Sequence, residues 1–423
     1  MIRESVMQVR KRPVVLLVAE AVTLAHFARI VALARTLDSS RYEVVVASDP
    51  RYLSLADMDG LRYHPIQSIP GEAFARALEA GKPLYDSAAL EAYVSEDLDL
   101  LARVEPDLVV GDFRLSLAVS APLRRVPYAA LVNAYWSPCA KVDYPVPDLP
   151  FTRFLGLRFS QWLFDRVRPL AFARHARPLN RVRKRHGLPS LGADLRTVYS
   201  WSNHTLFTDL PDWVPQSRLP ANHRFIGVPR WSAGACLPEW WASLPEDKPV
   251  VLVTLGSSGH GVALPGIVAA LAQLPLTVIA VVAGKQGVDQ SQRNVFIADY
   301  LPLGLAMSRV HLLICNGGSL TSCEALAAGT PVLGVCFNMD QLLNMQAIER
   351  LGAGLTLRGA RVNATALREA VQHLLEEPHY RQAAQTVGKR IRDFDPGENF
   401  RAFVADILSS PSSSPSASSS CVP

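Results

Sequence analysis

Residues 316–341 read NGGSLTSCEALAAGTPVLGVCFNMDQ, the most informative stretch of the chain. Its glycines, Gly317 and Gly318, follow an apolar run and precede a segment with helical spacing. Glycine lets the backbone approach a ligand closely, and a helix start presents unpaired N–H groups with a partial positive charge. The turn from Asn316 to Thr321, including Ser319, therefore suits a phosphate or diphosphate. The alternative is a tight turn in which Ser or Thr only caps the helix.

Two later groups in the stretch favour a sugar nucleotide over a simple phosphate. Glu324 lies three residues after Thr321, so both occupy one helix face, where a carboxylate can accept two hydrogen bonds from a ribose diol. Asp340 and Gln341 follow the next strand-like run, and a carboxylate beside an amide can satisfy several sugar hydroxyls. The alternative for Asp340 is an acid that stabilises a helix start.

The stretch resembles the donor-binding signature of the UDP-glycosyltransferase superfamily, whose members have the GT-B fold. Eight positions match at the family's spacing: Gly317, Gly318, Thr321, Glu324, Gly329, Pro331, Asp340 and Gln341. The resemblance implies that the glycine turn with its hydroxyls binds the diphosphate, the Glu binds the ribose and the Asp-Gln pair binds the sugar. Gly352-Ala353-Gly354 resembles the family's turn after the donor helix and is interpreted as structural.

Four further positions carry weaker matches or a departure. Gly256 and Ser257 stand where the family has a Gly-Ser pair near the phosphates. Tyr300 begins a Tyr-Leu-Pro element that resembles the family's Trp-x-Pro, whose aromatic ring stacks on the base; a tyrosine packed at a strand end is the alternative. Asn316 stands where the family usually has His. Because Asn donates a hydrogen bond but carries no charge, donor affinity or donor choice is expected to differ.

The rest of the chain alternates strand-like and helix-like segments in two series, which predicts α/β architecture. Short apolar runs such as Val14–Ala19 and Val250–Leu255 are typical of parallel strands covered on both faces. We predict a GT-B arrangement of two facing, Rossmann-like, doubly wound domains with a cleft between the carboxyl ends of their sheets. The predicted boundaries are residues 1–228 for an acceptor-binding domain, 229–248 for a linker, 249–396 for the donor domain, 397–409 for a C-terminal helix and 410–423 for a disordered Ser/Pro-rich tail.

Glycosyl transfer to a hydroxyl needs a base, because an alcohol is a poor nucleophile until its proton leaves. His26 follows the first strand, and imidazole ordinarily titrates near working pH. Asp112 follows the strand-like run Leu108–Gly111, so both side chains are expected at one end of the same sheet, where a carboxylate would orient the imidazole. These positions resemble the family's catalytic His and partner Asp, although the approach to His26 is not glycine-rich. Helix-start packing for His26 and helix capping for Asp112 are the alternatives.

Composition limits the remaining possibilities. The 423-residue chain is 49% hydrophobic with a formal net charge of +5, which suits a globular protein and does not indicate nucleic acid. Six cysteines lack CxxC spacing, which favours reduced thiols over a metal site or disulfide framework. No run approaches the roughly 20 apolar residues of a membrane span, so we predict a cytoplasmic protein. Residues 153–185 hold nine arginines and one lysine against Asp165, which indicates a solvated helix face or, alternatively, peripheral contact with the inner face of an anionic membrane.

These observations lead to one predicted activity with two alternatives. The chain is expected to be an inverting transferase that moves a hexose from a nucleotide-diphosphate sugar, UDP-glucose or a dTDP-sugar, to a hydroxyl of a small hydrophobic acceptor. The resemblance implies that no metal or other cofactor takes part, and we expect a monomer or homodimer. The alternatives are a GT-B-fold sugar-nucleotide epimerase and a catalytically weak partner protein. A dinucleotide dehydrogenase is disfavoured, because no GxGxxG follows Val14–Ala19.

Overall fold

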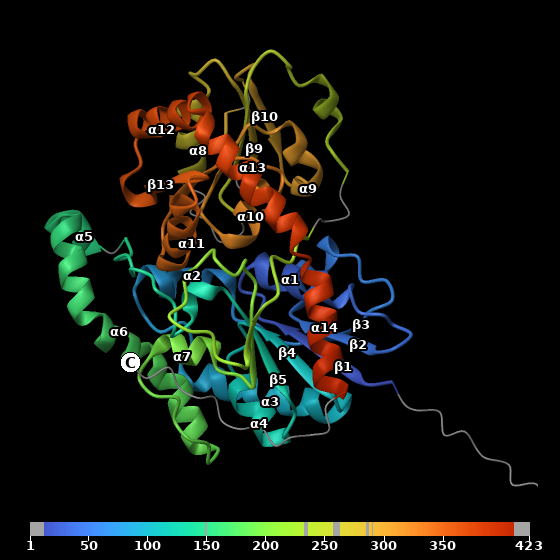
Figure 1. The fold of residues 1–423 in the computed structure, drawn as a ribbon. Helices are drawn as coiled ribbons and strands as arrows, with labels where there is room; N and C mark the ends of the chain where they lie inside the picture. The colour runs from blue at the N-terminus through green and yellow to red at the C-terminus, as the bar shows by residue number, and fades with distance from the viewer. Residues whose placement is uncertain are drawn as a thin grey trace, which may run out of the picture.

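The computed structural model describes residues 12–148, 150–231, 236–256, 263–284, 287–289 and 291–409. Within these ranges the chain forms two parallel sheets of seven and six strands. Each sheet belongs to its own domain, and in Figure 1 the second domain lies above the first. The first has the order β3-β2-β1-β4-β5-β6-β7, with β1 Val14–Ala19, β2 Glu43–Ser48, β3 Arg62–Pro65, β4 Leu108–Asp112, β5 Tyr128–Val132, β6 His204–Phe207 and β7 His223–Phe225. The second has the order β10-β9-β8-β11-β12-β13, with β8 Val250–Thr254, β9 Thr277–Val281, β10 Val295–Ala298, β11 Leu312–Cys315, β12 Val332–Cys336 and β13 Gly354–Arg358.

Helices cover both faces of each sheet, which is why the central strands are apolar on both sides. Those of the first domain are α1 Leu24–Ala34, η1 Pro50–Leu55, α2 Gly71–Glu79, α3 Ser87–Val104, α4 Leu117–Arg124, η2 Ala134–Trp136, α5 Pro150–Leu155, α6 Leu157–Arg185 and α7 Leu195–Ser200. The rest of the described chain adds η3 Glu239–Ser243, α8 Leu264–Leu271, α9 Leu303–Ala306, η5 Met307–Arg309, α10 Ser319–Ala327, α11 Met339–Arg350, η6 Gly359–Arg361, α12 Ala364–Glu376, α13 Pro378–Asp393 and α14 Pro396–Ser409. The predicted GT-B architecture is confirmed.

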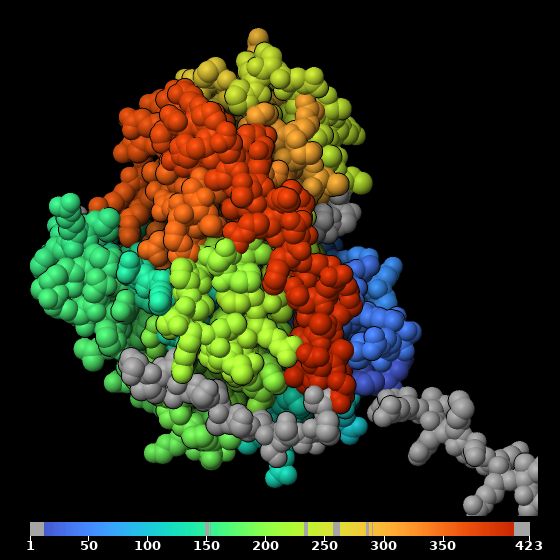
Figure 2. Space-filling view, viewed as in Figure 1, coloured from blue at the N-terminus to red at the C-terminus, as the bar shows by residue number. Residues whose placement is uncertain are grey.

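The last helix joins the two domains. The α13 helix lies along the second domain and α14 continues onto the first, as the red segment in Figure 2 shows. Phe400, Phe403 and Val404 of α14 are fully buried in one core with strand residues of β1 and β4. The sequence predicted a helix at 397–409 but not that it would pack against the opposite domain.

Some predictions fall outside the description or need correction. Ser257 and the tail 410–423 lie outside the described residues. Free thiols are found at Cys236, Cys315, Cys323 and Cys336, whereas Cys139 is disulfide-bonded, so the prediction of reduced thiols is wrong for that residue. No helix in the described ranges is long and apolar enough to cross a membrane.

Candidate active site

His26 and Asp112 meet at the carboxyl end of the first sheet. Strands β1 and β4 are neighbours, and Ala19 pairs with Asp112 in their register. His26 lies in the first turn of helix α1, and the imidazole Nδ1 is 2.7 Å from Asp112 Oδ1. Asp112 is 1% exposed and the His26 side chain 17% exposed, so the carboxylate is enclosed while the imidazole reaches the cleft. The predicted encounter of these two side chains is confirmed.

Arg29 is the residue that sequence reasoning missed at this pair. Its Nε and Nη2 donate to the two oxygens of Asp112 at 2.8 and 2.9 Å. Burial opposes the charged form of Asp112, but the Arg29 guanidinium and His26 outweigh burial and lower the pKa of that carboxyl. The available signal was spacing, because a residue three positions after His26 shares its helix face.

The His26 tautomer follows from these contacts. Arg29 Nη2 lies 3.1 Å from His26 Nδ1, but two N–H donors cannot bond to each other. We therefore assign the Nδ1 proton to the shorter contact with Asp112, which leaves Nε2 free to accept a proton.

An aromatic run leads away from His26 through the first domain. Phe113 stacks on the imidazole with ring centroids 5.1 Å apart and contacts Tyr199 at 5.4 Å. Trp136 lies 5.1 Å from Tyr199 and 6.3 Å from Tyr144. Phe113 has a φ of 60°, a conformation that costs energy for a bulky residue and aims its ring at His26. These rings give the His26 imidazole an aromatic, apolar surrounding within the first domain.

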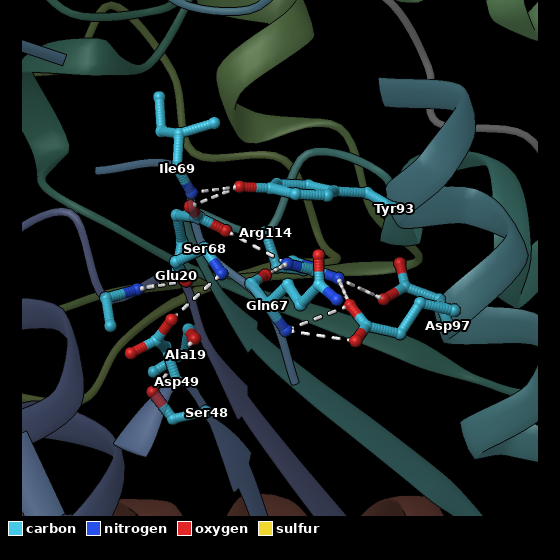
Figure 3. Close-up of polar contacts among 12 residues, drawn as sticks. Ala19, Glu20, Ser48, Asp49, Gln67, Ser68, Ile69, Tyr93, Asp97 and Arg114 are labelled. Atoms are coloured by element: carbon cyan, nitrogen blue, oxygen red, sulfur yellow. Dashed lines mark hydrogen bonds and ion pairs between the residues drawn. The ribbon is translucent and has the colours of Figure 1, made fainter. Parts of the chain in front are cut away.

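A buried ionic cluster anchors the segments that carry His26 and Asp112 (Figure 3). Glu20, directly after β1, accepts from Tyr93 at 2.9 Å and from Arg114 at 3.1 Å. Arg114 also donates to Asp97 at 3.0 Å and to the Gln67 carbonyl at 2.6 Å. Burial raises the pKa of Glu20 and of Asp97 although Arg114 opposes it. In the UDP-glycosyltransferase superfamily the segment before this histidine is glycine-rich. In this chain the hydrogen bonds and ion pair of Glu20 hold that segment in place.

The glycine turn of the second domain has a geometric requirement for glycine. Gly317 has a φ of 79°, and a Cβ there would lie 2.5 Å from Cys336 Sγ and 2.9 Å from Met345 Cγ. Asn316 is buried, and its side-chain oxygen accepts from the Gly318 amide at 3.1 Å, which fixes the turn from within. Asn316 thereby replaces the family's His with a turn-forming side chain.

Helix α10 begins at Ser319, directly after this turn. The amides of its first three residues, Ser319 to Thr321, have no partners inside the helix because of their position, so they are potential hydrogen-bond donors to an anion. Ser319 and Thr321, the two hydroxyl-bearing residues of this turn, are half-buried. The diphosphate site itself stays a prediction.

The predicted ribose ligand is held by the linker. Glu324 is 3% exposed, and its Oε1 accepts from the Trp231 amide at 3.2 Å. Its Oε2 lies 3.3 Å from Arg230 Nη2. Burial raises the pKa of Glu324 while Arg230 opposes the shift. A ribose would share this carboxylate with the two linker residues.

The predicted sugar ligands are also partly engaged. Asp340 Oδ1 accepts from the indole N–H of Trp136 at 2.8 Å, a contact that crosses from the first domain. Gln341 is buried, and its side-chain oxygen accepts from the Asn338 amide at 3.3 Å, which completes a capping box with Asn338, and from the Phe337 amide at 2.8 Å. Gln341 therefore has a helix-capping role that the sequence analysis did not assign.

Gly256 and Tyr300 are the remaining described residues that the sequence predicted at the donor site. Gly256 has a φ of 66° and its added Cβ would lie 3.4 Å from Asn316 Nδ2, so it adjoins the glycine turn. Tyr300 follows β10 and is half-buried, and burial raises its pKa to about 12.

A His–Asp pair at the carboxyl end of one parallel sheet and a glycine turn at the carboxyl end of a second parallel sheet are the arrangement of a GT-B glycosyltransferase. A model of the erythromycin biosynthesis protein CIII-like C-terminal domain matches residues 266–398. The chain belongs to the family of PGL/p-HBAD biosynthesis glycosyltransferases. It is 45% identical over 401 residues to such a glycosyltransferase of Mycobacterium tuberculosis (strain ATCC 25177 / H37Ra), covering 95% of this chain and 92% of that one.

Two further proteins extend the comparison. A PGL/p-HBAD biosynthesis rhamnosyltransferase of Mycobacterium bovis (strain BCG / Pasteur 1173P2) is 48% identical over 374 residues, with 88% of this chain and 83% of that one covered. The spinosyn rhamnosyltransferase SpnG, in complex with thymidine diphosphate, superposes with a TM-score of 0.64 at 20% identity, covering 93% of this chain and 100% of that chain. It has also been solved with spinosyn aglycone, with a TM-score of 0.61.

Proposed function

We propose that this glycosyltransferase inverts the anomeric carbon of its donor, with His26 as the general base. The observation that carries the proposal is the 2.7 Å His26–Asp112 pair, which side-chain bonds through Arg29 and Asn133 connect to Ser319, directly after the Gly317–Gly318 turn. The acceptor O–H proton goes to His26 Nε2 as the oxygen attacks the anomeric carbon. The bond from that carbon to the diphosphate breaks, and its electron pair leaves with the diphosphate. The start of α10 stabilises the departing charge, and no step requires a metal.

We propose a dTDP-linked 6-deoxyhexose, with rhamnose as the first candidate, and a hydrophobic acceptor. The M. bovis relative named a rhamnosyltransferase and the thymidine diphosphate bound to SpnG support the donor. One oxygen of Asp340 is already occupied by Trp136, which leaves fewer acceptors for sugar hydroxyls. The aromatic run from Phe113 to Tyr144 supports an apolar acceptor. UDP-glucose is the competing donor.

The test uses the full chain with dTDP-rhamnose, UDP-glucose or GDP-mannose and a series of alkylphenol acceptors. Mass spectrometry of the products and NMR of the anomeric centre are expected to give an inverted rhamnoside. An epimerised sugar nucleotide formed without acceptor would establish the epimerase instead. Binding of dTDP with no turnover of any acceptor would establish a non-catalytic partner protein.

We also propose that α5 and the first half of α6 dock this enzyme on an anionic membrane. Of the nine large apolar side chains that are most exposed in the described residues, six lie within 154–170, among them Phe154 at 87% and Leu170 at 73%. This part of the chain stands out from the body at the left of Figure 1. Phe159, Trp162 and Leu170 share one face of α6, because Trp162 is three residues after Phe159 and Leu170 is eight residues, or twice four, after Trp162.

Basic side chains continue the same face toward the end of α6. They are exposed and spaced by three, four or eight residues: Arg166, Arg174, Arg177, Arg181 and Lys184. Arg166 also lies over the Trp162 ring at 3.8 Å. An apolar end that enters the interface and a basic end that meets anionic headgroups match an interfacial helix. The middle of α6 contacts the aromatic run, with the ring centroids of Phe172 and Tyr144 5.6 Å apart. A lipid-borne acceptor would therefore have a short path from the membrane to these rings.

Flotation with phosphatidylglycerol-containing and pure phosphatidylcholine vesicles tests the docking without donor or acceptor. We expect binding only to the anionic vesicles, falling with salt, and at least about ten-fold weaker in Phe159→Ser/Trp162→Ser/Leu170→Ser. Leu219→Ser/Leu305→Ser, which removes two exposed leucines elsewhere, is the matched control. Equal binding to both vesicle types, or by both variants, would remove the proposal. A wild-type dimer that the triple variant dissociates would instead assign this face to a second copy.

A further inference from the structure

Two side chains at the η2 turn of the first domain donate hydrogen bonds to residues of the second domain. Asn133, the residue before η2, donates through Nδ2 to Ser319 Oγ at 3.1 Å. Trp136, the last residue of η2, donates to Asp340 Oδ1 at 2.8 Å. Ser319 begins the helix that faces the diphosphate and Asp340 lies in the first turn of the helix that faces the sugar. One short turn of the acceptor domain therefore touches both parts of the donor site.

The same Asn133 also reaches the base. Its side-chain oxygen accepts from Arg29 Nη1 at 2.9 Å, while Arg29 binds both oxygens of Asp112. Asp112 in turn holds His26. An unbroken series of side-chain contacts thus runs from His26 through Asp112, Arg29 and Asn133 to Ser319. Its three central members are at most 9% exposed, so water competes little with these bonds.

The orientation of the Asn133 amide is fixed by its neighbours. Arg29 offers only donors, so the amide oxygen must face it and the amide nitrogen must face Ser319. Asp209, another acceptor, lies 3.4 Å from the same nitrogen. An aspartate at 133 would place a second carboxylate beside Asp209, and an alanine would break the series.

We propose that Asn133 is a positioning residue that couples occupation of the diphosphate site to the alignment of His26. Ser319 accepts from Asn133 and so keeps its own proton for a phosphate oxygen. The donors then point in one direction, from Arg29 to Asn133, from Asn133 to Ser319 and from Ser319 to the diphosphate. Bonds polarised in series strengthen one another, so a bound donor tightens the hold on Arg29 and through it on Asp112. The coupling rests on the transfer reaction proposed above.

A double-mutant cycle on kcat tests the coupling. We expect Asn133→Ala to lower kcat by about ten-fold or more and to change the Kd for dTDP by less than about three-fold. Ser319→Ala should lower kcat less in the Asn133→Ala background than in the wild type, because the part of its effect that passes through the series is already lost. Thr208→Val is the matched control: Thr208 accepts from the same Arg29 nitrogen at 3.2 Å, and among the described residues its side chain has no hydrogen bond to the second domain. Its effect on kcat should add to that of Ser319→Ala.

The outcomes separate the coupling from the reaction. Additive effects of Asn133→Ala and Ser319→Ala on kcat, with an active wild type, would overturn the coupling and leave the transferase in place. A loss of dTDP affinity that accounts for the whole defect of Asn133→Ala would also overturn it. Absence of turnover by the wild type would refute the proposed reaction itself. Unfolding midpoints of all variants, measured in parallel, identify any that lose activity by losing the fold.

Discussion

At the scale of single residues, His26 bears the proposed chemistry while its neighbours fix its geometry. His26→Ala should lower kcat by about 10²–10⁴-fold, because the acceptor loses its base, while the Kd for dTDP stays within about two-fold. Steady-state kinetics and calorimetry measure the two quantities. Asp112→Asn is the companion variant, since it keeps the shape but cannot support an imidazolium. A parallel loss of turnover and donor binding in His26→Ala would count against the base role.

A second residue-scale prediction concerns Asp209. Burial, opposed by the Ala134 amide and Asn133, raises its pKa to about 6. Because the folded-state pKa lies above the unfolded value of about 3.8, this carboxyl stabilises the fold at low pH, and that contribution is lost as the pH rises through about 6. Between pH 4 and 6 the free energy of unfolding of the wild type should fall relative to Asp209→Asn by about 1.4 kcal/mol per pH unit. Urea unfolding at several pH values measures the difference; parallel curves would contradict the assignment.

At the scale of elements, the turn between β11 and α10 depends on glycine for two reasons. Gly317→Ala must adopt a positive φ and place a Cβ 2.5 Å from Cys336 Sγ. Gly352→Ala is the matched control, with a φ of 70° but its nearest contact at an ordinary 3.7 Å. We expect about 1–2 kcal/mol of destabilisation for Gly352→Ala and about 2–3 kcal/mol more for Gly317→Ala, which should also lose the thermal shift induced by dTDP. Equal destabilisation by the two variants would show that the crowding has no consequence.

At the scale of the whole molecule, α14 belongs to one domain by sequence and to the other by packing. Phe400 and Phe403 are fully buried against strands of the first sheet. Phe400→Ala should lower the free energy of unfolding by about 3–5 kcal/mol, because it opens a cavity in that core. Leu305→Ala, at an exposed site of the second domain, should cost less than about 0.5 kcal/mol. Chemical denaturation compares the two; a cost below about 1 kcal/mol for Phe400→Ala would refute the bridging role.

The sequence by itself determined the two parallel sheets, the glycine turn and the encounter of His26 with Asp112. These follow from local rules, since apolar runs set the strands, glycines set the turn, and the carboxyl ends of parallel strands share an edge. Only the tertiary structure decided that Arg29 holds Asp112, that Arg230 and Trp231 hold Glu324, that Gln341 caps its own helix and that Asn133 and Trp136 cross the cleft. Apart from the Gln341 cap, such bonds join residues about 80 to 200 positions apart. The Arg29–Asp112 bond depends on how α1 packs against β4, and the bonds of Asn133 and Trp136 depend on how the two domains pack against each other. Sequence spacing alone does not give the partners in such long-range packing.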